Sequence, residues 1–423
     1  MGIYISEKTI YKAVIWSFFL METITLQLFG GSFRIYFIFS LLTIFILLPN
    51  VKYLNGNIII ASVAYIMALF ISTIFSDSVS GAFTNTCSNI LYICTAYAIC
   101  LMMVAGIFEA NEIQETLCNI LLFIIIFGLI QYIIYYTTGI SLLKGISEGQ
   151  ISGVSNEPNG HGKIVGMALA FSFPALVRME PGRCKQKYKL LFTLSALTMI
   201  ISIARNVLYS IIVTAIIMFC YYMPKRNVRN QLIKILFVCG VLVGVAVFLI
   251  NSGVLRLGEW STEKLQNLFI TNIDDVLDDG SGSFRLPALM ASIDSWLESV
   301  KTFLVGHGPG QAYALINGYY YTRVAGNGIL AGLPGTGIIG EIPYVAMLIL
   351  PIIYAKKLSN ILNFIESDAS DVSFSEQVMA IGIYVFVLDF ISSAFYFAVM
   401  WTVVALGFYC ETEYRRILNS EMD

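Results

Sequence analysis

Four short clusters stand out in this sequence as places that could bind charge or move a proton. They are residues 153–162, residues 202–206, Arg285 after a glycine-rich turn, and the glycine-rich stretch 306–341. Arginine stays charged at neutral pH and holds phosphate through two hydrogen bonds, whereas histidine titrates near neutrality and can act as a base. The clusters therefore favour anion binding beside a candidate proton acceptor.

The first cluster reads Gly-Val-Ser-Asn156-Glu-Pro-Asn159-Gly-His161-Gly and precedes an apolar block. Asn, Pro and Gly are common turn residues, so one interpretation is a turn in which Asn caps the next helix. A helix start that faces a cavity also binds anions through its free N–H groups. The two interpretations are compatible, and both stay open.

Two arginines each admit a functional and a structural interpretation. Arg205 lies between two short apolar blocks, where a charged hairpin tip favours function, although arginine also extends toward lipid phosphates. Arg285 opens an expected amphipathic helix, so it either binds phosphate beside a helix start or pairs with a nearby aspartate such as Asp278 or Asp279.

The fourth cluster combines Gly-His307-Gly-Pro-Gly with Asn327 and the run Gly335-Thr-Gly-Ile-Ile-Gly-Glu341. So many glycines predict irregular backbone at the membrane edge, which is tolerated where it lines protein or water. His307 is a candidate base, and a loop histidine bonded to a carbonyl group is the alternative.

The elements that must position these clusters are membrane-spanning helices. Of the 423 residues, 57% are hydrophobic and 12% are charged, about half the charge of a soluble domain. The apolar blocks match the length of the hydrocarbon core and lack the alternation of barrel strands. The sequence therefore predicts an all-α polytopic integral membrane protein in a lipid bilayer. The net charge of −2 argues against a nucleic-acid partner, and no spacing predicts a metal or a cofactor.

About twelve spans are expected, with a split of the last two at Asp389–Ser393. They lie near residues 12–29, 34–49, 57–75, 86–108, 117–137, 161–177, 190–204, 206–222, 234–251, 335–355, 377–393 and 394–410. The chain then divides into spans one to nine (1–251), a large loop containing an amphipathic helix (252–334), and the last three spans with a tail (335–423). Most basic residues of the short connections fall on one side, which places both termini in the cytoplasm and the large loop outside.

In their order and topology, these residues resemble the O-antigen polymerase and ligase superfamily of bacterial glycan assembly. The resemblance covers roughly residues 150–345. Its motifs are G-x-x-x-N-x-P-N at 153–159, Ser-x-x-Arg at 202–205, Arg285 followed by Trp296, Gly-x-Gly-Pro-Gly at 306–310 and the glycine pair at 337 and 340. The family often has His-Asn ahead of that pair and an acidic residue just before it, where this chain has Gly326-Asn327 and Pro334-Gly335. The missing histidine favours the polymerase branch, since the ligases rely on it more.

The resemblance implies a metal-independent glycosyltransferase of the bacterial cytoplasmic (inner) membrane. Such an enzyme joins polyprenyl-diphosphate-linked oligosaccharide repeat units into O-antigen or capsular polysaccharide on the outer side, with a chain-length regulator and a flippase as partners. It assigns catalysis to Arg205 and Arg285, which would hold the diphosphate, and to His307 as the base. It assigns substrate binding to Asn156, Asn159, His161 and Asn327.

Two alternatives stay open. A ligase of the same superfamily would transfer finished glycan from the lipid carrier to an acceptor. A lipid-linked oligosaccharide flippase or transporter should show paired halves and charged residues buried within its spans. We expect neither feature, because the charges gather outside one face, with Glu22 and Asp389 as rare exceptions.

Overall fold

The computed structural model contains two compact units, each assembled from three separate stretches of chain. It describes residues 6–21, 24–28, 31–140, 151–155, 158–179, 182–202, 204–225, 229–235, 240, 244, 282–312, 314–316, 319–321, 328–365 and 367–420. Unit 1 comprises Met1–Ile24, Gly106–Phe269 and Ala355–Tyr384, and unit 2 comprises Thr25–Ala105, Ile270–Tyr354 and Val385–Asp423. The domain boundaries expected from topology (1–251, 252–334 and 335–423) stay predictions about the membrane.

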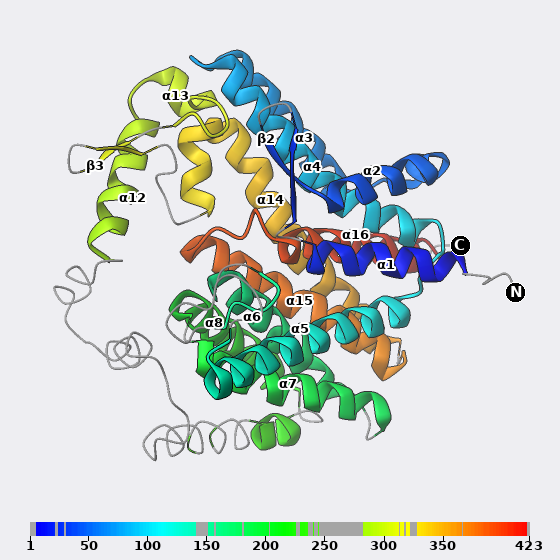
Figure 1. The fold of residues 1–423 in the computed structure, drawn as a ribbon. Helices are drawn as coiled ribbons and strands as arrows, with labels where there is room; N and C mark the ends of the chain where they lie inside the picture. The colour runs from blue at the N-terminus through cyan, green and yellow to red at the C-terminus, as the bar shows by residue number, and fades with distance from the viewer. Residues whose placement is uncertain are drawn as a thin grey trace, which may run out of the picture. The chain divides into compact units, whose positions relative to one another are not determined.

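Unit 1 is helical wherever it has regular structure in the described residues (Figure 1). Its elements are α1 (Glu7–Leu20), α5 (Ala110–Thr138), α6 (Pro158–Arg178), α7 (Arg183–Ser202), α8 (Arg205–Tyr222), a short helical stretch at 229–235, the end of α14 (Gly328–Phe364) and most of α15 (Ala369–Ile391). Helix α6 contacts α5, α7 and α8. In its apolar window 94% of the residues are buried, against 28% for α8. Helix α6 is therefore the central helix of this unit.

Two glycines let neighbours approach α6 closely. A methyl group at Gly166 would overlap the Tyr384 hydroxyl, and one at Gly162 would lie 2.8 Å from the Ala204 methyl. The Tyr384 hydroxyl donates a 2.9 Å hydrogen bond to the Lys163 carbonyl. These contacts bring the start of α6 next to α15 and to the residue that precedes α8.

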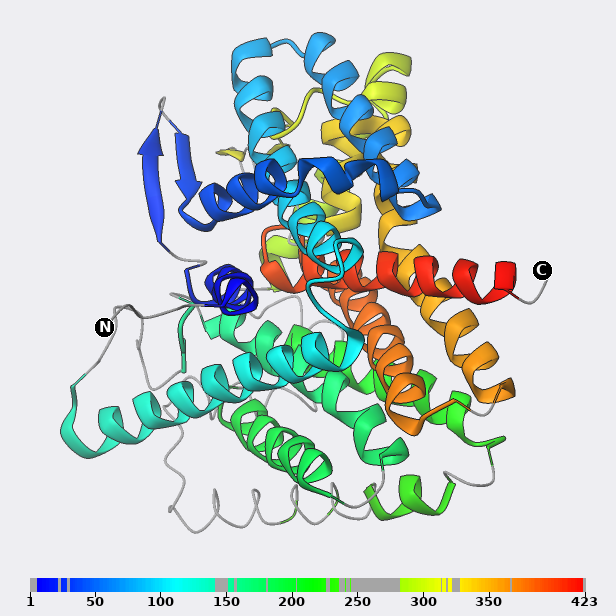
Figure 2. The same cartoon turned by 90° about the vertical axis from the view of Figure 1, so that its right-hand side faces the viewer.

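Unit 2 combines helices with two short β-hairpins (Figures 1 and 2). Its elements are β1 (Thr25–Leu28), β2 (Gly31–Arg34), α2 (Tyr36–Ile46), the 3-10 helix η1 (Leu48–Tyr53), α3 (Asn57–Ile74), α4 (Val79–Val104), α12 (Gly282–Trp296), α13 (Val300–Val305), β3 (Ala314–Ile316), β4 (Tyr319–Tyr321), the first part of α14 and α16 (Ala398–Ser420). Helices α2, α3 and α16 all contact α4. The core beside α4 is aromatic: Tyr92 lies 5.7 Å from the Phe395 ring and stacks 6.4 Å from Trp401.

Seven of the described helices are long and apolar enough to cross a membrane. They are Asn57–Ile74, Val79–Val104, Ala110–Thr138, Asn159–Arg178, Arg205–Tyr222, Gly328–Phe364 and Ala369–Ile391. The chain is therefore a helical membrane protein, as its composition predicts. A total of twelve spans stays a prediction. Most of the ninth expected span (234–251) and residues 252–281 and 322–327 of the expected outer loop lie outside the described residues.

The first expected span, 12–29, is wrong in its second half. Helix α1 ends at Leu20, and Thr25–Leu28 pairs antiparallel with Gly31–Arg34. Fourteen helical residues rise only about 21 Å, short of the hydrocarbon core of about 30 Å. The Gly-Gly dipeptide at 30–31 favours a tight hairpin over a continuous helix.

Other boundaries near Pro and Gly also differ from expectation, while two elements are confirmed. The second expected span, 34–49, is broken after Ile46, where Pro49 helps start η1. The tenth begins at Gly328 instead of 335 and contains a break at Gly337. The split near Asp389–Ser393 is confirmed, since α15 ends at Ile391 and α16 begins at Ala398. The expected helix after the glycine-rich turn is α12.

Candidate functional site

A small polar cavity of about 100 Å³ lies within unit 2. Its walls come from α3, α4, both sides of the break in α14, and the segment between α15 and α16. The polar lining residues are Tyr65, Asn89, Thr336, Glu341, Tyr344, Ser393 and Tyr396. A cavity of this size holds a few water molecules or one small polar group.

Glu341 supplies a buried carboxylate to this cavity. Its side chain is 6% exposed, and neither carboxylate oxygen has a hydrogen-bond partner among the residues that the structure describes. Burying an unpaired carboxylate away from water is costly, and ionisable residues within membrane helices commonly serve a function. The side chain is therefore a candidate for binding a ligand or accepting a proton.

Asp389 is a second buried carboxylate of the same unit, and unlike Glu341 it is held in place. The Tyr344 hydroxyl donates a 2.8 Å hydrogen bond to one of its oxygens, and the Ala394 amide donates a 2.5 Å hydrogen bond to the other. Tyr344 lies three residues after Glu341, on the same face of α14. Helix α14 therefore brings Glu341 and the tyrosine that orients Asp389 to one side.

Two glycines one helical turn apart make room for both carboxylates. A methyl group at Gly328 would overlap the carboxylate of Asp389, and one at Gly332 would overlap that of Glu341. Residues four apart on a helix share a face. The first part of α14 thus presents bare backbone to both acids, which no other residue type would allow.

We expect Gly332→Ala to displace the Glu341 side chain and to lower activity at least as much as it lowers stability. The added methyl group would overlap a carboxylate oxygen, so the carboxylate must shift from its position in the cavity. Activity in membranes and the melting temperature of the purified chain measure the two effects. Gly182→Ala is the control, because a methyl group there meets nothing within 4 Å; equal activity in both variants would contradict the prediction.

The glycine-rich cluster forms irregular backbone, as its sequence predicts. Gly337 interrupts α14 with φ 61° and ψ −172°, and Gly306 has φ 72°. A methyl group on Gly337 would overlap the backbone of Leu304, and one on Gly306 would overlap Gly335. Only glycine fits both requirements, positive φ and close backbone approach.

Backbone hydrogen bonds tie the 306–310 loop to the break in α14. The amide of His307 donates to the Pro334 carbonyl at 2.8 Å, and the amide of Gly308 donates to the Gly335 carbonyl at 3.0 Å. Ser72 of α3 donates to the same Gly335 carbonyl at 2.8 Å. Pro309 and Gly310 then line the cavity that contains Glu341, so the motif segment and the buried acid meet at one place.

The His307 side chain is directed elsewhere. Its Nε2 atom lies 3.0 Å from the Ser295 hydroxyl, 3.1 Å from the Ser295 carbonyl and 3.5 Å from a Glu298 carboxylate oxygen. It is buried and is not among the residues that line the cavity. The structure therefore matches the alternative interpretation, a loop histidine bonded to a carbonyl group.

The first two clusters meet within unit 1. Asn159 is exposed near the start of α6, and Arg205 is the half-buried first residue of α8. The close approach of Gly162 to Ala204 places these two helix starts side by side. His161 is fully buried, and a methyl group at Gly128 or Gly153 would overlap its ring, so this histidine fills a tight niche instead of facing an open site.

The remaining predicted residues fall at the edge of the described chain or beyond it. Arg285 lies in the first turn of α12, in unit 2, whereas Arg205 belongs to unit 1. Asn156 and Asn327 lie outside the described residues. The convergence of Arg205 and Arg285 on one diphosphate therefore stays a prediction.

The expectation that Glu22 and Asp389 are the rare charges within the spans is incomplete, because Glu341 is buried as well, and two further acids are buried just beyond the expected spans 377–393 and 394–410. Four acidic side chains are buried in the described helices: Glu341, Glu376, Asp389 and Glu411. Glu411 accepts hydrogen bonds from the amides of Asn57 and Ile58 at the start of α3. Glu376 accepts two from Arg178, at 2.6 Å and 2.8 Å. Three of the four have described partners that explain their burial, and Glu341 is the exception.

Glu341 and Asp389 can both be found in the sequence, but no role is predicted for either residue there. Glu341 is part of the glycine-rich run, and Asp389 is a rare charge in an apolar block. An acid inside an apolar block is itself a signal of function. That signal could have identified both residues as candidates. It could not have predicted that Asp389 has hydrogen-bond partners and that Glu341 has none among the described residues.

Known proteins add no family assignment: no protein-family model matches the chain, and no curated protein matches it significantly. Fold and site define a helical membrane protein in which a buried carboxylate, without a hydrogen-bond partner in the part of the chain that the structure describes, lies beside a glycine-rich helix break.

Proposed function

We propose that this chain is a membrane glycosyltransferase that joins polyprenyl-diphosphate-linked oligosaccharide repeat units on the outer side of a bacterial cytoplasmic membrane. The observation that carries the proposal is the carboxylate of Glu341, which has no hydrogen-bond partner among the described residues and lies in a cavity lined in part by the Gly-x-Gly-Pro-Gly segment. That segment is one of the motifs through which the sequence resembles the polymerase superfamily. Glu341 then supplies the proton acceptor that the family places elsewhere and that His307 is poorly placed to provide.

The reaction needs a base and a site for the leaving group. A hydroxyl of the acceptor sugar attacks the anomeric carbon of the donor, and its proton passes to Glu341 as the new C–O bond forms. The bond from that carbon to the diphosphate breaks, and the electron pair leaves with the diphosphate. Arg205 and Arg285 stabilise the leaving group, since arginine binds phosphate bidentately and stays charged.

The size of the cavity limits what enters it. A volume of about 100 Å³ admits a hydroxyl-bearing group but not an oligosaccharide, so the glycan itself lies outside. Asp389 is not among the described lining residues. It holds the lining residue Tyr344 in place through the hydrogen bond that the Tyr344 hydroxyl donates to it.

A lipid-linked oligosaccharide transporter is the second candidate. It is favoured by the break in α14 at Gly337, four residues before Glu341. Transporters use interrupted helices and buried acids to bind substrate and coupling ions near the middle of the membrane. Glu341 and Asp389 would then exchange protons or bind a cation, and neither would activate a hydroxyl.

Deletion of the gene with profiling of the cell-surface glycan tests the proposal. We expect loss of polymer while one repeat unit is still attached to its acceptor. Loss of all attachment would indicate a ligase. Accumulation of lipid-linked units on the cytoplasmic side would indicate a flippase, and an unchanged glycan ladder would rule out all three.

A further inference from the structure

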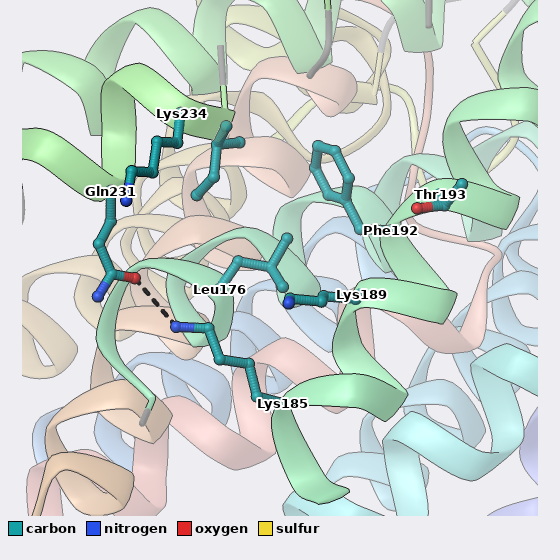
Figure 3. Close-up of a pocket in the computed structure, with 8 residues that line it drawn as sticks. Leu176, Lys185, Lys189, Phe192, Thr193, Gln231 and Lys234 are labelled. Carbon is teal, nitrogen blue, oxygen red and sulfur yellow. Dashed lines mark hydrogen bonds between the residues drawn. The ribbon is translucent and has the colours of Figure 1, made fainter. Parts of the chain in front are cut away.

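A second, larger cavity lies in unit 1, at the end of α6 opposite Asn159 and His161. Its volume is about 530 Å³, and its walls come from α6, α7 and the helical stretch 229–235. Three lysines, Lys185, Lys189 and Lys234, line it together with Gln231 (Figure 3). No acidic side chain is among its described lining residues, so the cavity is strongly cationic.

Lys185 is buried in the wall of the cavity and held there by hydrogen bonds. Lys185 is 9% exposed, and its ammonium group donates to the Met179 carbonyl at 2.5 Å and to the Gln231 side chain at 3.0 Å. Burial lowers the pKa of Lys185, and the charge of Lys189 lowers it further. An ammonium group has three donors, so one is left for a ligand. A bound anion here would offset both the cost of burying the Lys185 charge and its repulsion by Lys189.

An apolar cavity adjoins the lysines. Its volume is about 240 Å³, it lies between α6, α7 and α8, and its walls share Phe192 and Ile235 with the cationic cavity. Thr214 is the only residue with a polar side chain in its described lining, and the Thr214 hydroxyl is already bonded to the Ser210 carbonyl. A cationic mouth joined to an apolar chamber is complementary to a molecule with an anionic head and a hydrocarbon chain.

We propose that unit 1 binds an anionic glycerophospholipid, with its phosphate at Lys185, Lys189 and Lys234 and an acyl chain between α6, α7 and α8. Basic pockets between membrane helices bind anionic headgroups. A soluble phosphate would satisfy the lysines but would leave the apolar chamber unfilled. The site is separate from the Glu341 cavity, and the inference does not depend on the proposed function.

Native mass spectrometry of the full chain tests this inference, with phosphatidylglycerol titrated into neutral detergent. We expect Lys189→Gln/Lys234→Gln to weaken phosphatidylglycerol binding about tenfold or more, because each lysine near a lipid phosphate contributes substantially to affinity. Lys187→Gln/Lys356→Gln is the matched control: it removes the same charge from exposed lysines outside the cavity, and its affinity should be unchanged.

A second pair of measurements separates the lipid from other ligands. Ala215→Phe fills the apolar chamber and leaves the lysines intact, so it should also weaken lipid binding. Inorganic phosphate should not displace the lipid at millimolar concentration. Displacement by phosphate, or equal affinity in the double-lysine variant and its control, would overturn the inference. Should the double variant fail to fold, Lys189→Gln alone, at an exposed position, provides the same comparison.

Discussion

Glu341→Gln is expected to lower glycan polymerisation by at least about 100-fold, the usual contribution of a positioned general base. Glutamine keeps the size of the side chain but cannot accept a proton at neutral pH. The measurement uses the purified full chain in proteoliposomes with lipid-linked repeat units, and it quantifies polymer against time.

The same substitution is expected to leave the melting temperature unchanged or to raise it. The carboxylate of Glu341 has no described partner to lose, and a neutral amide is easier to bury than a carboxylate. Lost activity with retained stability is the signature of a functional residue. Glu413→Gln, on the more exposed face of α16, is the control. Full activity of Glu341→Gln would contradict the assignment of Glu341 as the base. The glycan profile of the gene deletion would still test the class of enzyme.

Arg178→Leu is expected to lower the free energy of unfolding by about 3–5 kcal/mol, because it leaves a buried charge without its main partner. Glu376 is 0% exposed and binds Arg178 through two hydrogen bonds. Tyr222 and Lys225 also donate to it, at 2.7 Å and 3.1 Å. The network joins α6, the end of α8 and α15 within unit 1.

A double-mutant cycle checks the origin of this effect. Arg178→Leu/Glu376→Leu removes both charges, so it should be more stable than Arg178→Leu alone. Arg416→Leu breaks the pair of an exposed arginine with Glu413 and should change stability by less than about 1 kcal/mol. Chemical denaturation in mixed micelles measures all three. A double variant as unstable as the single one would show that packing, and not charge, dominates.

The sequence predicts the class of fold well because hydropathy acts locally. An apolar block must be helical in hydrocarbon wherever its neighbours lie, so the long helices and the junction after Ile391 could be found in advance. Glycine density likewise predicted irregular backbone in this stretch, although the expected span 335–355 ran through the break at Gly337. The errors arise where local signals compete: Gly-Gly at 30–31 and Pro49 ended helices that hydropathy alone would have continued.

The site was predicted less well because it depends on partners. Asp389 resembles Glu341 in sequence, each being an acid within an expected span, whereas Glu376 and Glu411 lie just outside the expected spans 377–393 and 394–410. Only the folded chain shows that tyrosines, backbone amides or Arg178 satisfy the other three. His307 was a candidate base only because histidine can accept a proton near neutral pH. Its hydrogen bond with Ser295 could not be inferred from the spacing of residues in the sequence.

The interleaving of the two units has a consequence for biosynthesis. Each unit takes its last stretch from the final 69 residues of the chain, Ala355–Tyr384 for one and Val385–Asp423 for the other. The first amides of α3 gain their hydrogen-bond acceptor only when Glu411 has been made. Arg178 of α6 likewise gains its carboxylate partner only when Glu376 has been made. Because the ribosome delivers the chain from the N-terminus, neither unit can complete its packing until the stretch from Ala355 onward has been made. A premature stop near residue 350 would therefore leave both units incomplete, instead of sparing the first.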